Sequence, residues 1–135
     1  MKALVYDGIQ KVQCREVEDP KIEKDDDIIV KVTSTAICGS DLHLVHGLVK
    51  GMYDGLVLGH ETMGIIEEIG KGVKELKMRQ CPATRYVKPI LEQIKNGEFD
   101  ATDIITHKLS LEEGRHAYEI FDAKEDNCIK VILKP

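Results

Sequence analysis

Three side chains of different chemistry are spaced so that they could bind one metal ion. Cys38 offers a thiolate, His60 an imidazole and Glu61 a carboxylate. Zinc accepts all three ligand types, and a catalytic zinc site combines three protein ligands with one open position. A strand or loop that returns Cys38 to the adjacent pair His60-Glu61 would complete such a site. A buried Cys38 beside an unrelated His-Glu loop is the alternative, and the spacing alone leaves both interpretations open.

Polar residues next to Cys38 could support chemistry at that site. Asp41 could fix the tautomer of a ligating imidazole, or it could simply cap a helix. The hydroxyl of Ser40 could pass a proton from a zinc-bound alcohol to His43 and then to solvent. A capping serine and a surface histidine are the simpler alternative, which the residues by themselves favour. Ser40 and His43 are therefore candidate catalytic residues, and Asp41 is a candidate support for a ligand.

Length, composition and charge exclude several classes of protein. A chain of 135 residues with 42% apolar residues fits one compact domain. The net charge of −5 gives no electrostatic reason to bind nucleic acid or an anionic membrane. The sequence has no run of eighteen apolar residues, and its N-terminus does not resemble a signal peptide. We expect a cytoplasmic protein with no membrane or nucleic-acid partner, whose four cysteines are thiols or ligands.

The first half of the chain predicts β structure interrupted by one short helix. Residues 1–37 have the composition of strands, and the apolar residues of 28–36 alternate. Residues 38–46 predict a short helical turn that stops at Gly47. Residues 62–69 predict a further strand, which the turn Gly70-Lys71-Gly72 closes.

The second half predicts two helices and a final strand. The first helix has apolar residues three and four positions apart and ends at Asn96-Gly97. Ser110 and Glu113 predict a capping box for the second helix, and residues 128–133 predict the last strand. The two apolar helix faces consist of Val87, Ile90, Leu91 and Ile94, and of Ala117, Tyr118 and Phe121.

The sequence lacks a convincing nucleotide-binding motif. Gly70-Lys71-Gly72 matches the start of G-x-G-x-x-G, but Glu75 stands at the third glycine position and no βαβ unit is predicted after it. We therefore interpret the segment as a turn and expect no cofactor-binding residues. Cys81 is a weak candidate for an additional metal ligand, because nothing near it in the sequence would orient it.

Two motifs resemble those of the zinc-dependent medium-chain alcohol dehydrogenases. They are Cys38-Gly39-Ser40-Asp41-Leu42-His43 and Gly59-His60-Glu61-Thr62-Met63-Gly64, and the similarity extends to residues 1–6, 70–73 and 89–132. The alcohol and formaldehyde dehydrogenase branch is the most similar. The resemblance implies a mainly β, GroES-like β-barrel catalytic domain with two C-terminal helices. It also implies zinc ligands, a proton relay and a residue behind His60: respectively Cys38, His60 and Glu61; Ser40 and His43; and Asp41.

The chain departs from this family in its middle. Family members insert a nucleotide-binding Rossmann domain there, and they have a third usual zinc ligand and often a lobe of four close cysteines; we find none of these. Residues 1–79 and 84–135 resemble the first and last parts of the family. We therefore predict that residues 1–135 form a single GroES-like domain, an apparent fusion of these two parts.

The family reaction is the NAD(P)-dependent oxidation of a small alcohol or reduction of an aldehyde. Hydride transfer requires a cofactor held against the substrate. We predict a truncated zinc dehydrogenase that holds zinc weakly, does not bind NAD(P) and is inactive alone. The alternatives are a metal-binding or oligomerising module without catalysis, and a cofactor-independent zinc hydrolase.

We also expect a homo-oligomer. Loss of the nucleotide-binding domain should expose apolar side chains near Leu42, Val45, Leu48 and Leu56, and large apolar patches usually become interfaces. A shortened join near residues 80–82 would favour exchange of halves between chains, because domain swapping is a low-cost route to a dimer.

Overall fold

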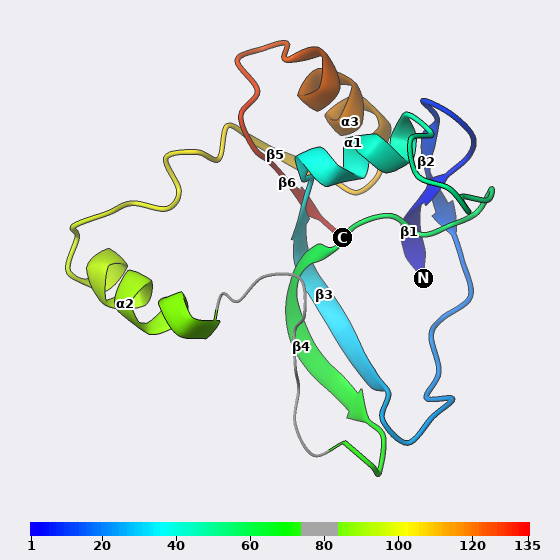
Figure 1. The fold of residues 1–135 in the computed structure, drawn as a ribbon, viewed down its shortest axis with the longest axis horizontal. Coiled ribbons are helices and arrows are strands. Elements are labelled where there is room, and N and C mark those ends of the chain that lie inside the picture. Colours follow the sequence, from blue (N-terminus) through cyan, green and yellow to red (C-terminus); the bar gives the residue numbers. More distant parts are fainter. Residues whose placement is uncertain (74–83) are drawn as a thin grey trace.

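The computed structural model describes residues 1–73 and 84–135, and it contains two sheets (Figure 1). β1 (Lys2–Tyr6) and β2 (Val12–Glu16) form an antiparallel pair. The second sheet has the strand order β4-β3-β6-β5. Its strands are β3 (Ile28–Ala36), β4 (Glu61–Ile69), β5 (His107–Ser110) and β6 (Val131–Lys134), and the helices are α1 (Gly39–Val45), α2 (Thr84–Lys95) and α3 (Gly114–Ala123).

These elements confirm the predicted class, a mainly β domain with GroES-like architecture and two C-terminal helices. The predicted strands over 28–36 and 62–69 are present, and so is the short helix after Cys38. Gly47 has a φ of +71°, which suits the glycine expected to stop that helix. The expected barrel is wrong in one respect, because the strands in the described part of the chain form two separate sheets and do not close.

The hydrophobic core lies where α3 packs against β1, β2 and β6. Val131 and Leu133 of β6 are 0% and 1% exposed, and Ala117 of α3 is 0% exposed. Ala117, Tyr118 and Phe121 share one buried face, as the sequence predicts. α3 also approaches β1 closely at Gly114, where an added Cβ would lie 2.3 Å from Leu4 Cδ2. The core therefore requires a residue without a side chain at the start of α3.

A short βαβ unit, β5-α3-β6, was not predicted from the sequence. β5 and β6 pair in parallel, with His107 opposite Val131, and α3 connects them. The predicted Ser110–Glu113 pair lies in the turn that leads into α3, where the amide N–H and the hydroxyl of Ser110 both donate to Glu113 Oε2 at 2.8 Å. The helix itself begins at Gly114. The final strand begins at Val131, three residues later than expected, and Asp126 and Asn127 in the turn before it adopt positive φ angles.

The apolar face of α2 is exposed. The helix forms as predicted, but it lies well apart from the sheets in Figure 1. Val87, Ile90 and Leu91 on its apolar face are each more than two-fifths exposed. The periodicity of the sequence thus predicted the helix correctly, but tertiary packing does not bury its apolar face.

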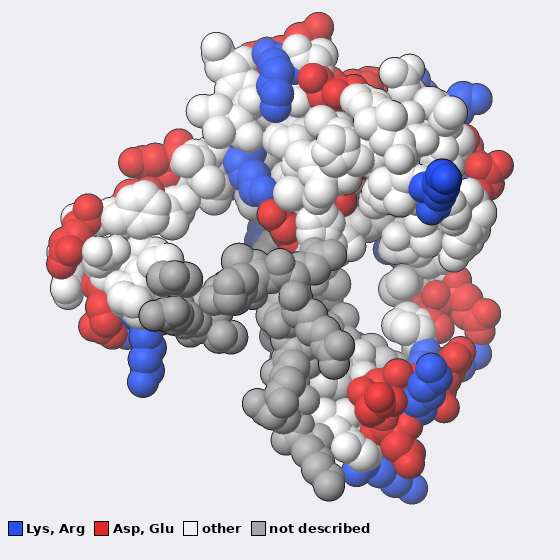
Figure 2. Space-filling model, viewed as in Figure 1, with Lys and Arg blue, Asp and Glu red and all other residues white. Residues whose placement is uncertain are grey.

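The antiparallel pair β3–β4 also extends away from the hydrophobic core (Figure 1). All nine residues of β4 are exposed, and Val30 of β3 is 41% exposed. Figure 2 shows acidic and basic side chains mixed near the loop that leads into β3. No helix among the described residues is long and apolar enough to cross a membrane.

The apolar residues expected to lose their cover are mostly packed. Val45 is 6% exposed, and Leu42 and Leu56 are partly buried against the core. Of the four residues named, Leu48 alone is exposed, at 69%. The expected join near residues 79–84 falls in the part of the chain that the structure does not describe, except for Thr84. Cys81 lies there as well.

Candidate metal centre

Strand pairing brings the two parts of the candidate site together. β3 and β4 are antiparallel with Ala36 opposite Glu61, so the end of β3 lies beside the start of β4. Cys38 follows β3 by two residues and immediately precedes α1. His60 immediately precedes β4. The antiparallel pairing of β3 and β4 thereby brings Cys38 close to the His60-Glu61 pair, as the sequence analysis required.

The structure brings the three predicted ligands into one cluster. Cys38, His60 and Glu61 each offer a ligand atom, and these atoms lie within 4.8 Å of one another. Ser40 joins two of them, because its hydroxyl lies 3.3 Å from Cys38 Sγ and 3.1 Å from His60 Nε2. The hydroxyl thus occupies the space between two potential ligands.

Asp41 is the buried support of this cluster. Its side chain is 0% exposed, and its Oδ2 accepts a hydrogen bond from the Cys38 backbone N–H at 2.9 Å. Its Oδ1 lies 2.9 Å from His60 Nδ1. Because Asp41 holds Nδ1 of His60, Nε2 is left facing Ser40 and Cys38. A carboxylate bound to one ring nitrogen commonly orients the other nitrogen of a histidine toward a metal ion. Asp41 therefore acts both at the start of α1 and behind His60.

The electrostatic surroundings shift the pKa values of Cys38 and His60 in opposite directions. The hydrogen bond from the Ser40 hydroxyl, with help from the Ser40 amide and His60, lowers the pKa of the Cys38 thiol; burial and the charge of Glu61 oppose this. Interaction with Cys38 raises the pKa of His60, aided by Asp41 and opposed by burial. A lowered thiol pKa favours the thiolate, which is the form that binds metals.

Lys130 is the residue that sequence reasoning missed. Its ammonium group donates to the Glu61 carboxylate and, at 3.1 Å, to the carbonyl oxygen of Ile37. Lys130 lies between α3 and β6, far from Glu61 in the sequence, and no motif signalled the contact. The Lys130 ammonium group thus holds the Glu61 carboxylate. One oxygen of that carboxylate still lies within 4.8 Å of the ligand atoms of Cys38 and His60.

A cavity of about 360 Å³ opens beside the cluster. Ser40, His43 and His60 all line it, so both members of the predicted relay face the same space. His43 is exposed, and the structure records no hydrogen bond between it and Ser40. The rest of the wall consists of Asp41, Gly59 and four apolar side chains, those of Leu44, Val49, Val57 and Leu58.

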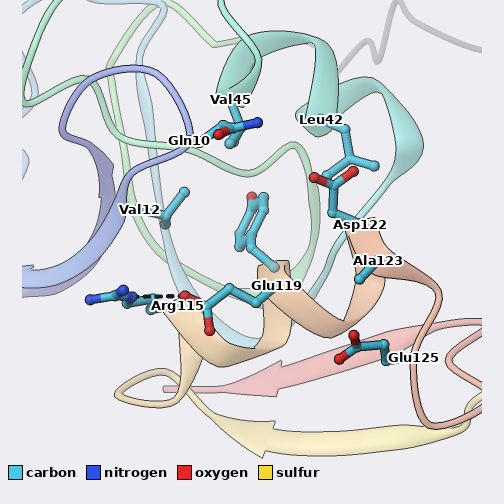
Figure 3. Close-up of a pocket in the computed structure, with 10 residues that line it drawn as sticks. Gln10, Val12, Leu42, Val45, Arg115, Glu119, Asp122, Ala123 and Glu125 are labelled. Carbon is cyan, nitrogen blue, oxygen red and sulfur yellow. Dashed lines mark hydrogen bonds and ion pairs between the residues drawn. The ribbon is translucent and has the colours of Figure 1, made fainter.

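A second cavity, of about 480 Å³, lies between α1 and α3 (Figure 3). Carboxylates from α3 and the residues after it gather along it, and Arg115 donates to Glu119 at 2.9 Å across its rim. Asp122 is engaged by His46 at 2.8 Å. None of the three metal donors lines this cavity, so the candidate site is the smaller one beside Cys38.

Comparison with known proteins assigns the family. Residues 24–131 match the family model of the alcohol dehydrogenase GroES-like domain, and the chain belongs to that family. It is 62% identical over 77 residues to an uncharacterized zinc-type alcohol dehydrogenase-like protein, AdhB, of Bacillus subtilis; the match covers 57% of this chain and 20% of that protein. A glutathione-independent formaldehyde dehydrogenase of Pseudomonas aeruginosa is 41% identical over 83 residues, covering 57% and 21%. The matches thus span about a fifth of these relatives' length.

Solved structures agree on the fold. An alcohol dehydrogenase, TADH, from Thermus sp. ATN1 superposes with a TM-score of 0.81 at 15% identity, covering 99% of each chain. A zinc-dependent alcohol dehydrogenase from Streptococcus pneumonia gives a TM-score of 0.52 at 34% identity, covering 64% of this chain and 28% of that one. The first likeness concerns the fold alone.

The residues present fit the zinc that this family implies. Thiolate, imidazole and carboxylate donors converge, and a buried carboxylate orients the imidazole. Two other side chains compete with a metal ion for these ligand atoms. Ser40 hydrogen-bonds to Cys38 and His60, and Lys130 hydrogen-bonds to Glu61. The cluster therefore has the chemistry of a zinc site together with two internal competitors for its ligands.

Proposed function

We propose that this chain is the zinc-binding catalytic domain of a zinc-type alcohol dehydrogenase, and that it holds zinc weakly through Cys38, His60 and Glu61. The observation that carries the proposal is the convergence of these donors in front of buried Asp41. Within the part of the chain that the structure describes, the cluster has three donors and no fourth protein ligand, which makes it an open site, and open sites are the catalytic kind. When bound, zinc would polarise the oxygen of an alcohol or aldehyde.

The other residues of the cavity have roles that follow from their positions. Ser40 is close enough to the donors to take a hydroxyl proton from a substrate that binds there, and His43 lies along the same cavity as an exit to solvent. The apolar wall, which includes Val49 and Val57, suits the carbon chain of a small alcohol or aldehyde. This assigns substrate contact to the wall and proton transfer to Ser40 and His43.

We further propose that the chain alone does not oxidise alcohols with NAD(P). Among the described residues, the parallel strand–helix–strand unit is β5-α3-β6, and its first loop carries Glu112 and Glu113. A dinucleotide site has glycines in this loop, and their backbone N–H groups bind the phosphates. Carboxylates there repel phosphate, so this unit does not suit a nicotinamide cofactor.

Zinc titration tests the metal site. The chain is washed with chelator and then titrated with zinc in competition with a chromophoric chelator. We expect zinc to be lost on washing and to rebind at one ion per chain, with an affinity in the micromolar range. Cys38→Ser should reduce that affinity at least tenfold, whereas Cys14→Ser, a matched change in β2, should not. No saturable binding, or equal binding by both variants, would contradict the proposal.

Turnover separates the competing functions. Calorimetric titration with NAD and NADP should show no saturable binding, and an alcohol-oxidation assay should match a Cys38→Ala control. Micromolar nucleotide binding or nucleotide-dependent turnover above that control would refute the proposed inactivity. Zinc binding without any turnover is expected both for an inactive dehydrogenase domain and for a metal-binding module, whereas zinc-dependent ester hydrolysis without nucleotide would favour the hydrolase.

A further inference from the structure

The cavity between α1 and α3 has the size and the walls of a small-molecule site (Figure 3). Its volume of about 480 Å³ lies within the usual range of such sites, about 300–1,000 Å³. β2, α1 and α3 contribute its apolar walls, which are Val12, Leu42, Val45 and Ala123. Such walls suit the methylene groups of an aliphatic ligand.

The charge of this cavity favours a cation. Its carboxylates are those of Glu119, Asp122 and Glu125, and among the described residues that line it Arg115 is the one cation. Arg115 donates to Glu119, and Asp122 contacts a histidine, His46. Glu125 is exposed, and its hydrogen bonds within the described chain come from its backbone alone. With histidine counted as neutral, the lining has a formal charge of −2.

A buried polar group without a partner lines the same cavity. Tyr118 of α3 is 5% exposed, and its phenol oxygen forms no hydrogen bond with any residue that the structure describes. Every sealed polar side-chain atom in the described part of the chain has a partner, so this oxygen opens onto free space. A phenol oxygen can accept a hydrogen bond from an ammonium group.

The phenol oxygen lies on the α1 side of the Tyr118 ring. The ring also borders an apolar cavity between the two sheets, which no residue of α1 lines. Burial and, secondarily, the charge of Asp41 raise the pKa of the phenol, and Asp41 lies in the first turn of α1. The polar end of Tyr118 therefore faces the cavity between the helices.

We propose that this cavity binds an aliphatic diamine in its doubly protonated form. The two ammonium groups would pair with Asp122 and Glu125, and the Tyr118 oxygen would accept a hydrogen bond from one of them. The methylene groups would contact the apolar walls. None of the three metal donors lines this cavity, so the proposal does not depend on zinc or on the proposed function.

Charge and walls together select a diamine over simpler ligands. A monoamine of the same length fits the walls but compensates one negative charge only. Magnesium carries two positive charges, but it demands octahedral oxygen ligands and gains nothing from apolar walls. These two cations therefore serve as controls for the carbon chain and for the charge.

Titration of the zinc-free chain with 1,4-diaminobutane, followed by amide chemical shifts, tests the site. We expect saturable shifts in residues 42–45 and 118–125, with a dissociation constant of about 1 mM or lower, which is reasonable for a ligand of this size. At matched ionic strength, n-butylamine should bind about fivefold more weakly, because it loses one ion pair. Magnesium chloride should produce no saturable shift in these residues.

Variants separate the proposed contacts from a general charge effect. Glu125→Gln should weaken binding about fivefold. Glu23→Gln, the same change at an exposed position outside the cavity, should leave binding unchanged. Tyr118→Phe keeps the ring in the core and removes the acceptor, so binding should weaken about two- to tenfold. Ala123→Phe should abolish binding, because it fills the cavity from an exposed position without changing the charge.

Several results would overturn the proposal. They are the lack of saturable shifts with the diamine, equal affinity for n-butylamine, and equal losses in Glu23→Gln and Glu125→Gln. Unchanged binding by Tyr118→Phe would remove the role of the phenol. Unchanged binding by Ala123→Phe would show that the diamine binds elsewhere on the chain.

Discussion

Replacing Asp41 by asparagine should weaken zinc binding without unfolding the chain. The carboxylate accepts a hydrogen bond from the Cys38 N–H at 2.9 Å and holds His60 Nδ1 at 2.9 Å. An amide of the same shape has one oxygen and one NH₂ group, so it can serve as acceptor at only one of these positions. At the other, two donors would face each other, and either Cys38 or His60 would lose its fixed orientation.

The magnitude follows from what such supports contribute elsewhere. Loss of the residue behind a metal-ligating histidine costs about 10- to 100-fold in metal affinity, which corresponds to about 1.4–2.8 kcal/mol of binding free energy. Because Asp41 is fully buried, the mispaired amide should also lower the free energy of unfolding by about 1–3 kcal/mol. Urea unfolding in the presence of chelator measures that second effect separately from zinc binding.

The control is Asp122→Asn. Asp122 also contacts a histidine, His46, at 2.8 Å, but it lies on α3 and away from the metal donors. This variant makes the same chemical change at an aspartate–histidine pair and should leave the zinc affinity within about twofold of the parent. The reasoning is refuted if Asp41→Asn remains folded and binds zinc as tightly as Asp122→Asn does.

Three further predictions concern the ligand competitors, the core and pH. Lys130→Met should raise the zinc affinity about fivefold, because it releases Glu61 from an ion pair. This estimate takes about 1 kcal/mol for a partly exposed ion pair. Competition titration with Lys134→Met as the control measures the effect, and an unchanged affinity would contradict it. Gly114→Ala should lower the free energy of unfolding by about 1–3 kcal/mol, because the added Cβ would lie 2.3 Å from Leu4 Cδ2. The control Gly39→Ala, whose Cβ would meet nothing within 4 Å, should change that free energy by less than about 0.5 kcal/mol. Equal effects of the two variants in urea unfolding would disprove the packing argument. In chelator, the stability that His60 contributes should be present below its unfolded pKa of about 6.5 and be lost as the pH rises through its raised folded pKa. The difference in unfolding free energy between the parent and His60→Gln should therefore shrink from pH 6 to pH 8, and growth of that difference would show that the sign is wrong.

The sequence predicted most of the local elements and the donor types of the candidate site. Alternating apolar residues predicted β3, and residues spaced three and four apart predicted α2 and one face of α3. The types of Cys38, His60 and Glu61 made them candidate zinc ligands before any contact was known, because ligand preference depends on the donor atom. Such properties are local or chemical, so a linear chain reveals them.

The tertiary structure decided what these residues contact. The antiparallel pairing of β3 with β4 sets the distance between Cys38 and His60, and a separation of twenty-two residues does not specify that distance. Lys130 reaches Glu61 because β6 pairs with β3, a contact that no local pattern encodes. The exposure of α2 and β4 was likewise invisible, since periodicity identifies an apolar face but not the surface that covers it. Long-range pairing and packing together set those outcomes.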